Sequence, residues 1–172
     1  YKTLIDTAVR FENTRVIRDA FKPKLINNDD ALFFGVWNQP DPIVKDSLLE
    51  SEKVKLDLWH WKDDRMQPQQ LNELKDDQDQ TNLYVYHFKT GQIVQLGRDS
   101  LDINIGNRKV INTLMASCED QYRYQTWHSP NPANYYTVSL ADGKITPLRD
   151  AVNYGTNLSP SGKYFSFWND KT

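Results

Sequence analysis

A recurring segment is the feature that most constrains how this chain can fold. The residues LYVYHFKTGQIVQLGRD, 83–99, return as YYTVSLADGKITPLRD, 135–150, and their glycines Gly91 and Gly143 are separated by 143 − 91 = 52 positions. Apolar positions, strand length and the turn glycine recur together. Internal periods of about 40 to 50 residues are typical of propeller blades. The repeat therefore predicts similar β-units stacked on one another.

Each copy of the repeat has the pattern of a β-hairpin. Aromatic and β-branched residues alternate before a turn, which reads Lys-Thr-Gly-Gln in the first copy and Ala-Asp-Gly-Lys in the second. Glycine tolerates the positive φ that such turns require. We therefore expect Gly91 and Gly143 to occupy left-handed turn positions.

A second recurring pattern is a polar turn followed by an apolar strand. It occurs at residues 27–35, 106–115 and 158–168, and a strand and a hairpin follow the first two of these copies. This order fits an antiparallel blade of about four strands. We expect an all-β fold, specifically a partial β-propeller with four-stranded antiparallel blades at about 28–96 and 106–148. The segment 158–168 is then the first strand of a third blade.

The number of blades bears on how much of a propeller the chain contains. Closed propellers use about four to eight blades, and residues 1–172 supply about two complete ones. We therefore expect an incomplete propeller domain that belongs to a longer protein. Its open sheet edges predict self-association of the isolated fragment.

One segment inside the first blade does not have a strand pattern. In residues 62–82, Pro68 suits a first helical turn, and Met66, Leu71 and Leu74 form a thin apolar stripe before an acidic end. We predict a short inserted helix near residues 66–79. This insertion is either a surface excursion or a projection that contacts a neighbouring domain or substrate.

Composition and the absence of known motifs limit the functions and the catalytic chemistry expected of this chain. The net charge of −2 does not indicate a nucleic-acid partner, and no apolar run reaches the roughly 20 residues of a membrane span. Cys118 is the single cysteine, and His60, His87 and His128 lie far apart within or beside aromatic strands, where we expect packed or edge histidines and not ligands. The motifs G-x-S-x-G and H-E-x-x-H and a Walker loop are missing. We predict no catalytic residue, no cofactor and no metal site.

Aromatic residues supply the remaining candidates for a site. The tryptophans and tyrosines lie on or beside expected strands, where they either pack blade against blade or line a sugar-binding or peptide-binding groove. Trp59 and Trp61 bracket His60 next to the insertion, and these three residues are candidates for substrate or interdomain contact. Glu73, on the predicted helix, is the fourth candidate.

Three segments carry a family resemblance. Residues 83–96 and 157–170 resemble blade motifs of the TolB-like, WD40-like propellers that precede the catalytic domain in S9 prolyl oligopeptidase-family peptidases. The segment VKLDLWHWKDDRMQPQQ, 54–70, is similar to exported bacterial dipeptidyl and acylaminoacyl peptidases of that family. The resemblance implies that the propeller caps an α/β-hydrolase domain holding the catalytic Ser, Asp and His. Some members bind a peptide amino terminus through a glutamate pair, which Glu73 alone does not match.

The resemblance leads to an expected function and leaves an alternative open. We expect a non-catalytic propeller segment that gates access and positions peptides for a C-terminal α/β-hydrolase domain outside this chain, in an exported or periplasmic serine peptidase. The alternative is a TolB-like, protein-binding propeller of a periplasmic or surface protein without enzymatic activity. A sialidase is disfavoured, because Ser161 stands where a sialidase Asp-box has aspartate.

Overall fold

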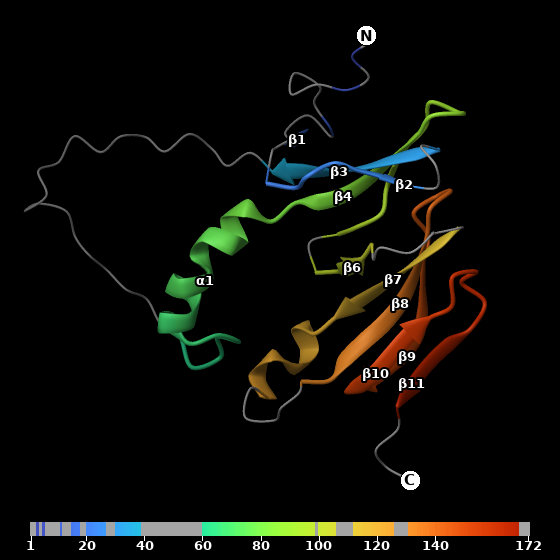
Figure 1. Ribbon diagram of the computed structural model, residues 1–172. Helices are drawn as coiled ribbons and strands as arrows, with labels where there is room; N and C mark the ends of the chain where they lie inside the picture. The colour runs from blue at the N-terminus through green and yellow to red at the C-terminus, as the bar shows by residue number, and fades with distance from the viewer. Residues whose placement is uncertain are drawn as a thin grey trace, which may run out of the picture.

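The chain folds mainly into antiparallel β-sheet, with one α-helix inserted between two strands of the first sheet (Figure 1). The computed structural model describes residues 3, 5, 11, 15–17, 20–26, 30–38, 60–98, 100–105, 112–125 and 131–168. The predicted all-β class and the predicted inserted helix are both confirmed.

The first sheet contains five strands. They are β1 (Arg15–Ile17), β2 (Lys24–Ile26), β3 (Ala31–Asn38), β4 (Asn82–His87) and β5 (Ile93–Gln95). The strand order is β1-β3-β4-β5, and β2 also pairs with β3 along a different part of its length. All of these pairings are antiparallel.

The second sheet is a four-stranded antiparallel meander. Its strands are β6 (Asp102–Asn104), β7 (Thr113–Cys118), β8 (Ala133–Ser139) and β9 (Ile145–Val152), in that spatial order. A 3₁₀ helix, η1 (Asp120–Gln125), lies between β7 and β8. The sequential order means that each strand pairs with the one before it, as local connections favour.

A third sheet follows directly along the chain. It pairs β10 (Tyr154–Leu158) with β11 (Phe165–Trp168) in antiparallel fashion. The ring of Phe165 lies 5.8 Å from Tyr135 of β8, and the guanidinium of Arg149 lies 5.4 Å from the ring of Phe167. The third sheet therefore packs on the second, and Figure 1 shows it beside β9.

The two copies of the sequence repeat form equivalent hairpins, β4–β5 and β8–β9. The Gly91 N–H donates to the His87 carbonyl at 2.8 Å, and the Gly143 N–H donates to the Ser139 carbonyl at 2.9 Å. The two glycines have φ of 70° and 69°. The predicted left-handed glycine in each hairpin turn is confirmed.

The first two sheets share one hydrophobic core. Its buried side chains are Ile26, Ala31, Phe33, Leu83, Val85, Val94, Leu96, Leu114, Ala116, Val138 and Leu140. The list draws on strands of both sheets, so the sheets stack face to face. The His87 side chain crosses between them, with Nε2 2.9 Å from the Leu140 carbonyl oxygen, which confirms this histidine as a packed one.

The opposite face of the first sheet is also covered. Phe34, Val36 and Tyr84 are buried there, and Phe11 packs against Phe34 and Tyr84 with ring centroids 5.9 and 5.4 Å apart. Alternate residues of β3 and β4 thus enter two different cores, as the two-residue period of a strand requires. The first sheet therefore buries apolar side chains on both of its faces.

The inserted helix α1 (Gln67–Asp79) begins with proline in its first turn, where a missing N–H has no helical partner to lose. None of its residues is buried, and Leu71 and Leu74 of the predicted apolar stripe are exposed. Its last turn is held by the Trp37 indole N–H, which donates to the Gln78 carbonyl at 2.6 Å. In the described parts of the chain, no helix combines the length and apolar composition that a bilayer crossing requires.

Equivalent glycines in different surroundings allow a stability test. A Cβ on Gly91 would meet only the Tyr86 hydroxyl at 3.9 Å, whereas one on Gly143 would overlap the Gln95 carbonyl of the first sheet. We expect Gly91→Ala to lower the free energy of unfolding by about 1 kcal/mol, the strain of a left-handed alanine. Gly143→Ala should cost roughly 2 kcal/mol more, because overpacking adds to this strain. Urea titrations measure both, and equal losses would contradict the close contact between the sheets.

Candidate functional site

A cleft of about 480 Å³ opens at one end of the interface between the first two sheets. It lies where β4 begins, where the chain crosses from β5 to β6, and where β7 runs into η1. The residues that line it are Phe21, Gln80, Thr81, Asn82, Leu83, Gly97, Arg98, Ser100, Leu101, Asp102, Ile103, Ile105, Ser117, Glu119, Asp120 and Arg123. They come from both sheets and combine apolar with charged side chains.

Close backbone contact positions the crossing segment that forms one wall of this cleft. The N–H groups of Leu96 and Gly97 both donate to the Leu83 carbonyl, at 2.8 and 3.1 Å. A Cβ on Gly97 would lie 3.2 Å from the Leu83 nitrogen and 3.2 Å from Cδ1 of Ile103. Because glycine has no Cβ, the chain passes tightly over β4 before it enters the second sheet.

Three charged side chains at the cleft have no partner among the described residues. The Arg98 guanidinium forms no hydrogen bond or ion pair with another described residue, and the same holds for the carboxylates of Asp102 and Glu119. All three residues are exposed. The cleft therefore presents charges of both signs to solvent, above the apolar side chains of Leu83 and Ile103.

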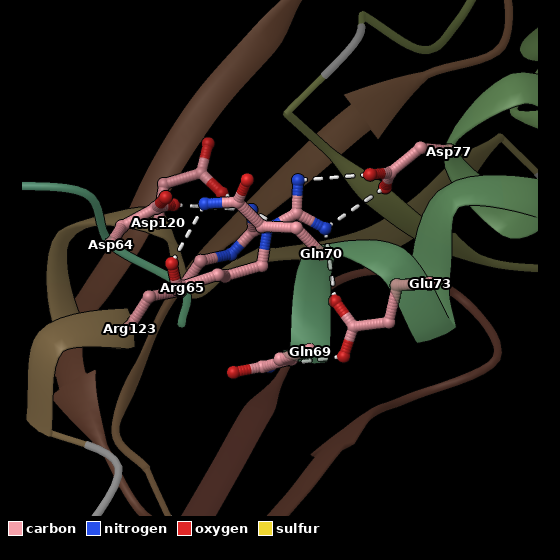
Figure 2. Close-up of polar contacts among 8 residues, drawn as sticks. All are labelled: Asp64, Arg65, Gln69, Gln70, Glu73, Asp77, Asp120 and Arg123. Carbon is pink, nitrogen blue, oxygen red and sulfur yellow. Dashed lines mark hydrogen bonds and ion pairs between the residues drawn. The ribbon is translucent and has the colours of Figure 1, made fainter. Parts of the chain in front are cut away.

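A separate charged cluster joins the start of the insertion to the side of α1 (Figure 2). Arg65 Nη1 lies 2.9 Å from Glu73 Oε2, and Arg65 Nη2 lies 2.9 Å from Asp77 Oδ2. Gln69 donates to Glu73 at 3.0 Å, and Gln70 donates to the Arg65 carbonyl at 2.8 Å. Residues four apart face the same side of a helix, so one guanidinium reaches both carboxylates.

The cluster shifts the protonation of its members. The hydrogen bond from Gln69, together with that from Arg65, holds the pKa of Glu73 below its ordinary value. The hydrogen bond from Arg65 likewise lowers the pKa of Asp77. Hydrogen bonds to Asp77 and Glu73 in turn raise the pKa of Arg65 above its already high value. All three groups are therefore charged at neutral pH.

Asp64 connects the insertion to the cleft. Its carboxylate lies 3.6 Å from Nη1 of Arg123, and Nη2 of Arg123 lies 3.1 Å from Asp120 on η1. Arg123 and Asp120 both line the cleft. Asp64 thus attaches the start of the insertion to η1. The neighbouring Arg65 attaches the same stretch to the side of α1, as Figure 2 shows.

Of the four candidates from the sequence, the three that the structure describes, His60, Trp61 and Glu73, do not line the cleft. His60 and Trp61 are exposed, with stacked rings 5.9 Å apart, and the Lys62 ammonium lies 5.1 Å from the Trp61 ring centroid. Glu73 belongs to the ion-pair cluster with Arg65. Trp59 lies outside the described residues. The contact roles predicted for these four residues stay predictions.

Sequence reasoning did not single out the residues of the cleft. Asp102 and Glu119 belong to no motif, Arg98 stands at the end of the first repeat copy without a role assigned to it, and the segments that carry them are brought together only by the stacking of the two sheets. One local signal exists, because the first hairpin continues as Leu-Gly-Arg-Asp where the second continues as Leu-Arg-Asp. The extra residue is Gly97, which makes the tight crossing beside the cleft.

The described part of the chain contains no group of three or more His, Cys, Asp or Glu residues that is arranged to hold a metal ion. No protein-family model matches the chain, and comparisons with curated proteins and with solved structures return no similar protein.

Replacing Arg65 tests the ion-pair cluster. In Arg65→Met, we expect the pKa of Asp77 to rise toward the ordinary carboxyl range near 4 and that of Glu73 to rise part of the way, since Gln69 still donates. Carbon-13 NMR titration of the side-chain carboxyls measures both values. Asp142, whose pKa is lowered by Ser139 and by the Lys144 backbone, is the internal control and should not move.

The lowered pKa values of Glu73 and Asp77 also determine how the stability of the fold changes with pH. A carboxyl with a lowered pKa in the folded state stabilises the fold above its ordinary pKa, and this contribution disappears as the pH falls through the lowered value. The wild-type chain should therefore lose this stabilisation in acid. Arg65→Met lacks the contribution of the Arg65 hydrogen bonds from the start, so its free energy of unfolding should fall less over the same acid range. Identical carboxyl titrations in the two proteins would contradict the cluster.

Proposed function

We propose that this chain is a non-catalytic propeller segment of an S9-like serine peptidase, which gates access and positions peptides for a hydrolase domain outside the chain. Three antiparallel sheets that follow one another along the chain, each packed on the one before, support the propeller part of the proposal. The observation that carries the peptide-binding part is the cleft between the first two sheets, with its unpaired charges of both signs.

The chemistry of the cleft suits a short peptide. Arg98 offers a guanidinium, whose geometry matches a carboxylate in two parallel hydrogen bonds. Asp102 and Glu119 accept hydrogen bonds from an ammonium group or from peptide N–H groups. Leu83 and Ile103 supply apolar contact for a small side chain, and the volume falls within the usual range of ligand pockets. The cleft thus matches the positive, negative and apolar parts of a peptide.

The insertion supplies the surface for a neighbouring domain. Trp61 is 77% exposed, and the apolar side chains of Met66 and Leu71 are 67% and 64% exposed. Large apolar side chains that stay in solvent are typical of interaction surfaces when they gather on one segment. In the proposed parent protein, this segment contacts the C-terminal α/β-hydrolase domain. In the TolB-like alternative, the same segment would bind a separate protein, and short peptides would not bind the cleft.

Peptide binding by the cleft is tested with tri-alanine. We expect the peptide to shift the NMR signals of the cleft residues and Arg98→Gln to weaken its affinity about tenfold, the effect of losing one charge-assisted hydrogen bond. Lys163→Gln is the matched control, because Lys163 is exposed and does not line the cleft. It removes the same charge and should leave the affinity unchanged.

Amidating the peptide identifies the group that Arg98 contacts. Tri-alanine amide lacks the terminal carboxylate, so it should bind the wild-type chain about as weakly as tri-alanine binds Arg98→Gln. Combining amide and variant should produce no further loss. Absence of any signal change at the cleft, or equal affinity for all these combinations, would remove the peptide-binding proposal.

The chain itself is expected not to hydrolyse peptides, because the resemblance to S9 peptidases implies that the catalytic Ser, Asp and His belong to the hydrolase domain. A chromogenic dipeptide anilide should release no product beyond the buffer blank. Product release that a serine-directed inhibitor abolishes would show that the chain is an enzyme in its own right and would overturn its assignment as a non-catalytic segment.

A further inference from the structure

Two buried asparagines occupy equivalent places in the repeat. Among the described residues, the buried polar side chains are those of Asn82 and Asn134, which are 134 − 82 = 52 positions apart, the same period as the turn glycines. Each lies where a helical segment leads into a strand, α1 into β4 and η1 into β8. A buried polar side chain costs free energy unless it forms hydrogen bonds. The partners of such a side chain therefore show what it holds in place.

The side chain of Asn134 connects η1 with two strands of the second sheet. Its Oδ1 accepts hydrogen bonds from the Tyr122 hydroxyl at 2.8 Å and from the Ala151 N–H at 3.0 Å. Its Nδ2 donates to Oε1 of Gln121 at 3.3 Å. Tyr122 and Gln121 belong to η1, Ala151 belongs to β9, and Asn134 itself lies in β8. One buried amide thus fastens the short helix to the sheet.

The backbone of Ala151 is strained where it meets this amide. Among the described residues other than glycine, Ala151 alone has a positive φ, 53°. Such a conformation is unfavourable for a residue with a Cβ and persists only where its surroundings determine it. The register of β8 against β9 shifts between Ala133 and Tyr135, next to Asn134, and Ala151 lies on the opposite strand there. The Asn134 side chain therefore marks a place where the sheet keeps an unfavourable backbone.

The helix that Asn134 holds forms one wall of the cleft. Asp120 and Arg123 of η1 line the cleft, and so does Glu119, which immediately precedes η1. The Tyr122 N–H donates to the Glu119 carbonyl at 2.8 Å, while the Tyr122 hydroxyl donates to Asn134. Tyr122 therefore joins the backbone of an unpaired cleft carboxylate to the buried amide.

We infer that Asn134 is a positioning residue of the cleft, which acts through Tyr122 to hold Glu119 toward the ammonium end of a bound peptide. The inference rests on the proposed peptide-binding function and deepens it, since Asn134 does not itself line the cleft. Its effect is selective for one end of the peptide. Arg98, which contacts the carboxylate end in that proposal, follows a segment held on β4 through the Leu83 carbonyl and not through η1.

The test compares two peptides on one variant. Tyr122→Phe removes the hydroxyl that donates to Asn134 and keeps the ring. We expect its affinity for tri-alanine to fall about fivefold, the effect of one hydrogen bond, and its affinity for N-acetyl-tri-alanine, which has no ammonium group, to stay unchanged. NMR titration of the cleft residues measures both affinities. Tyr164→Phe is the matched control, because Tyr164 is exposed and does not line the cleft, and it should bind both peptides like the unaltered chain.

Hydrogen exchange on the unaltered chain supplies a second measurement, which decides the question if Tyr122→Phe fails to fold. Tri-alanine should slow exchange at the Ala151 amide, which lies outside the cleft and is bonded to Asn134, and N-acetyl-tri-alanine should not. Equal weakening of both peptides by Tyr122→Phe, unchanged affinity for tri-alanine, or the same exchange at Ala151 with either peptide would overturn the inference alone. If the unaltered chain binds neither peptide, the proposed function fails and the inference fails with it.

Discussion

The burial of side chains between the first two sheets is the interaction on which the rest of this structure depends. Phe33, Val85 and Val138 are completely withdrawn from solvent in this core, and each such side chain contributes about 1.5 to 3 kcal/mol relative to exposure. The repeat segments meet here, since the turn of the second hairpin rests on the last strand of the first sheet. The hydrophobic effect is not directional, but the hydrogen bond between His87 and the Leu140 carbonyl depends on geometry and so helps to fix how the two sheets lie against each other.

The position of the cleft follows from the same stacking. Two sheets that pack through their centres leave space at one end, and the chain that crosses between them lines this space with Arg98 and Asp102. Arg98 and Asp102 are exposed, so their charged side chains do not have to fit the packing of the core. Their side chains are therefore available for a ligand, while the backbone that holds them is fixed against β4 through Leu83.

The extent to which this fold could be predicted from sequence depends on how local each feature is. The hairpin turns at Gly91 and Gly143 and the helix that begins near Pro68 are specified by adjacent residues, so the pattern was sufficient. The cleft depends on four segments that meet only after the sheets stack, and no spacing rule connects them. The ion pair of Glu73 with Arg65 was also hidden, because Arg65 precedes the helix and falls outside the three- and four-residue spacings of helical pairs.

The sheets and the insertion should respond differently to added salt, because different interactions hold them in place. The sheets are held by buried apolar side chains, and added salt does not screen that attraction. The insertion is held to η1 by the partly exposed pair of Asp64 and Arg123, whose attraction weakens as the Debye length shrinks to about 3 Å at 1 M salt. Raised ionic strength would then weaken the contact between Asp64 and Arg123 beside the cleft, while the Trp37 hydrogen bond to the last turn of α1 and the layered scaffold stay in place.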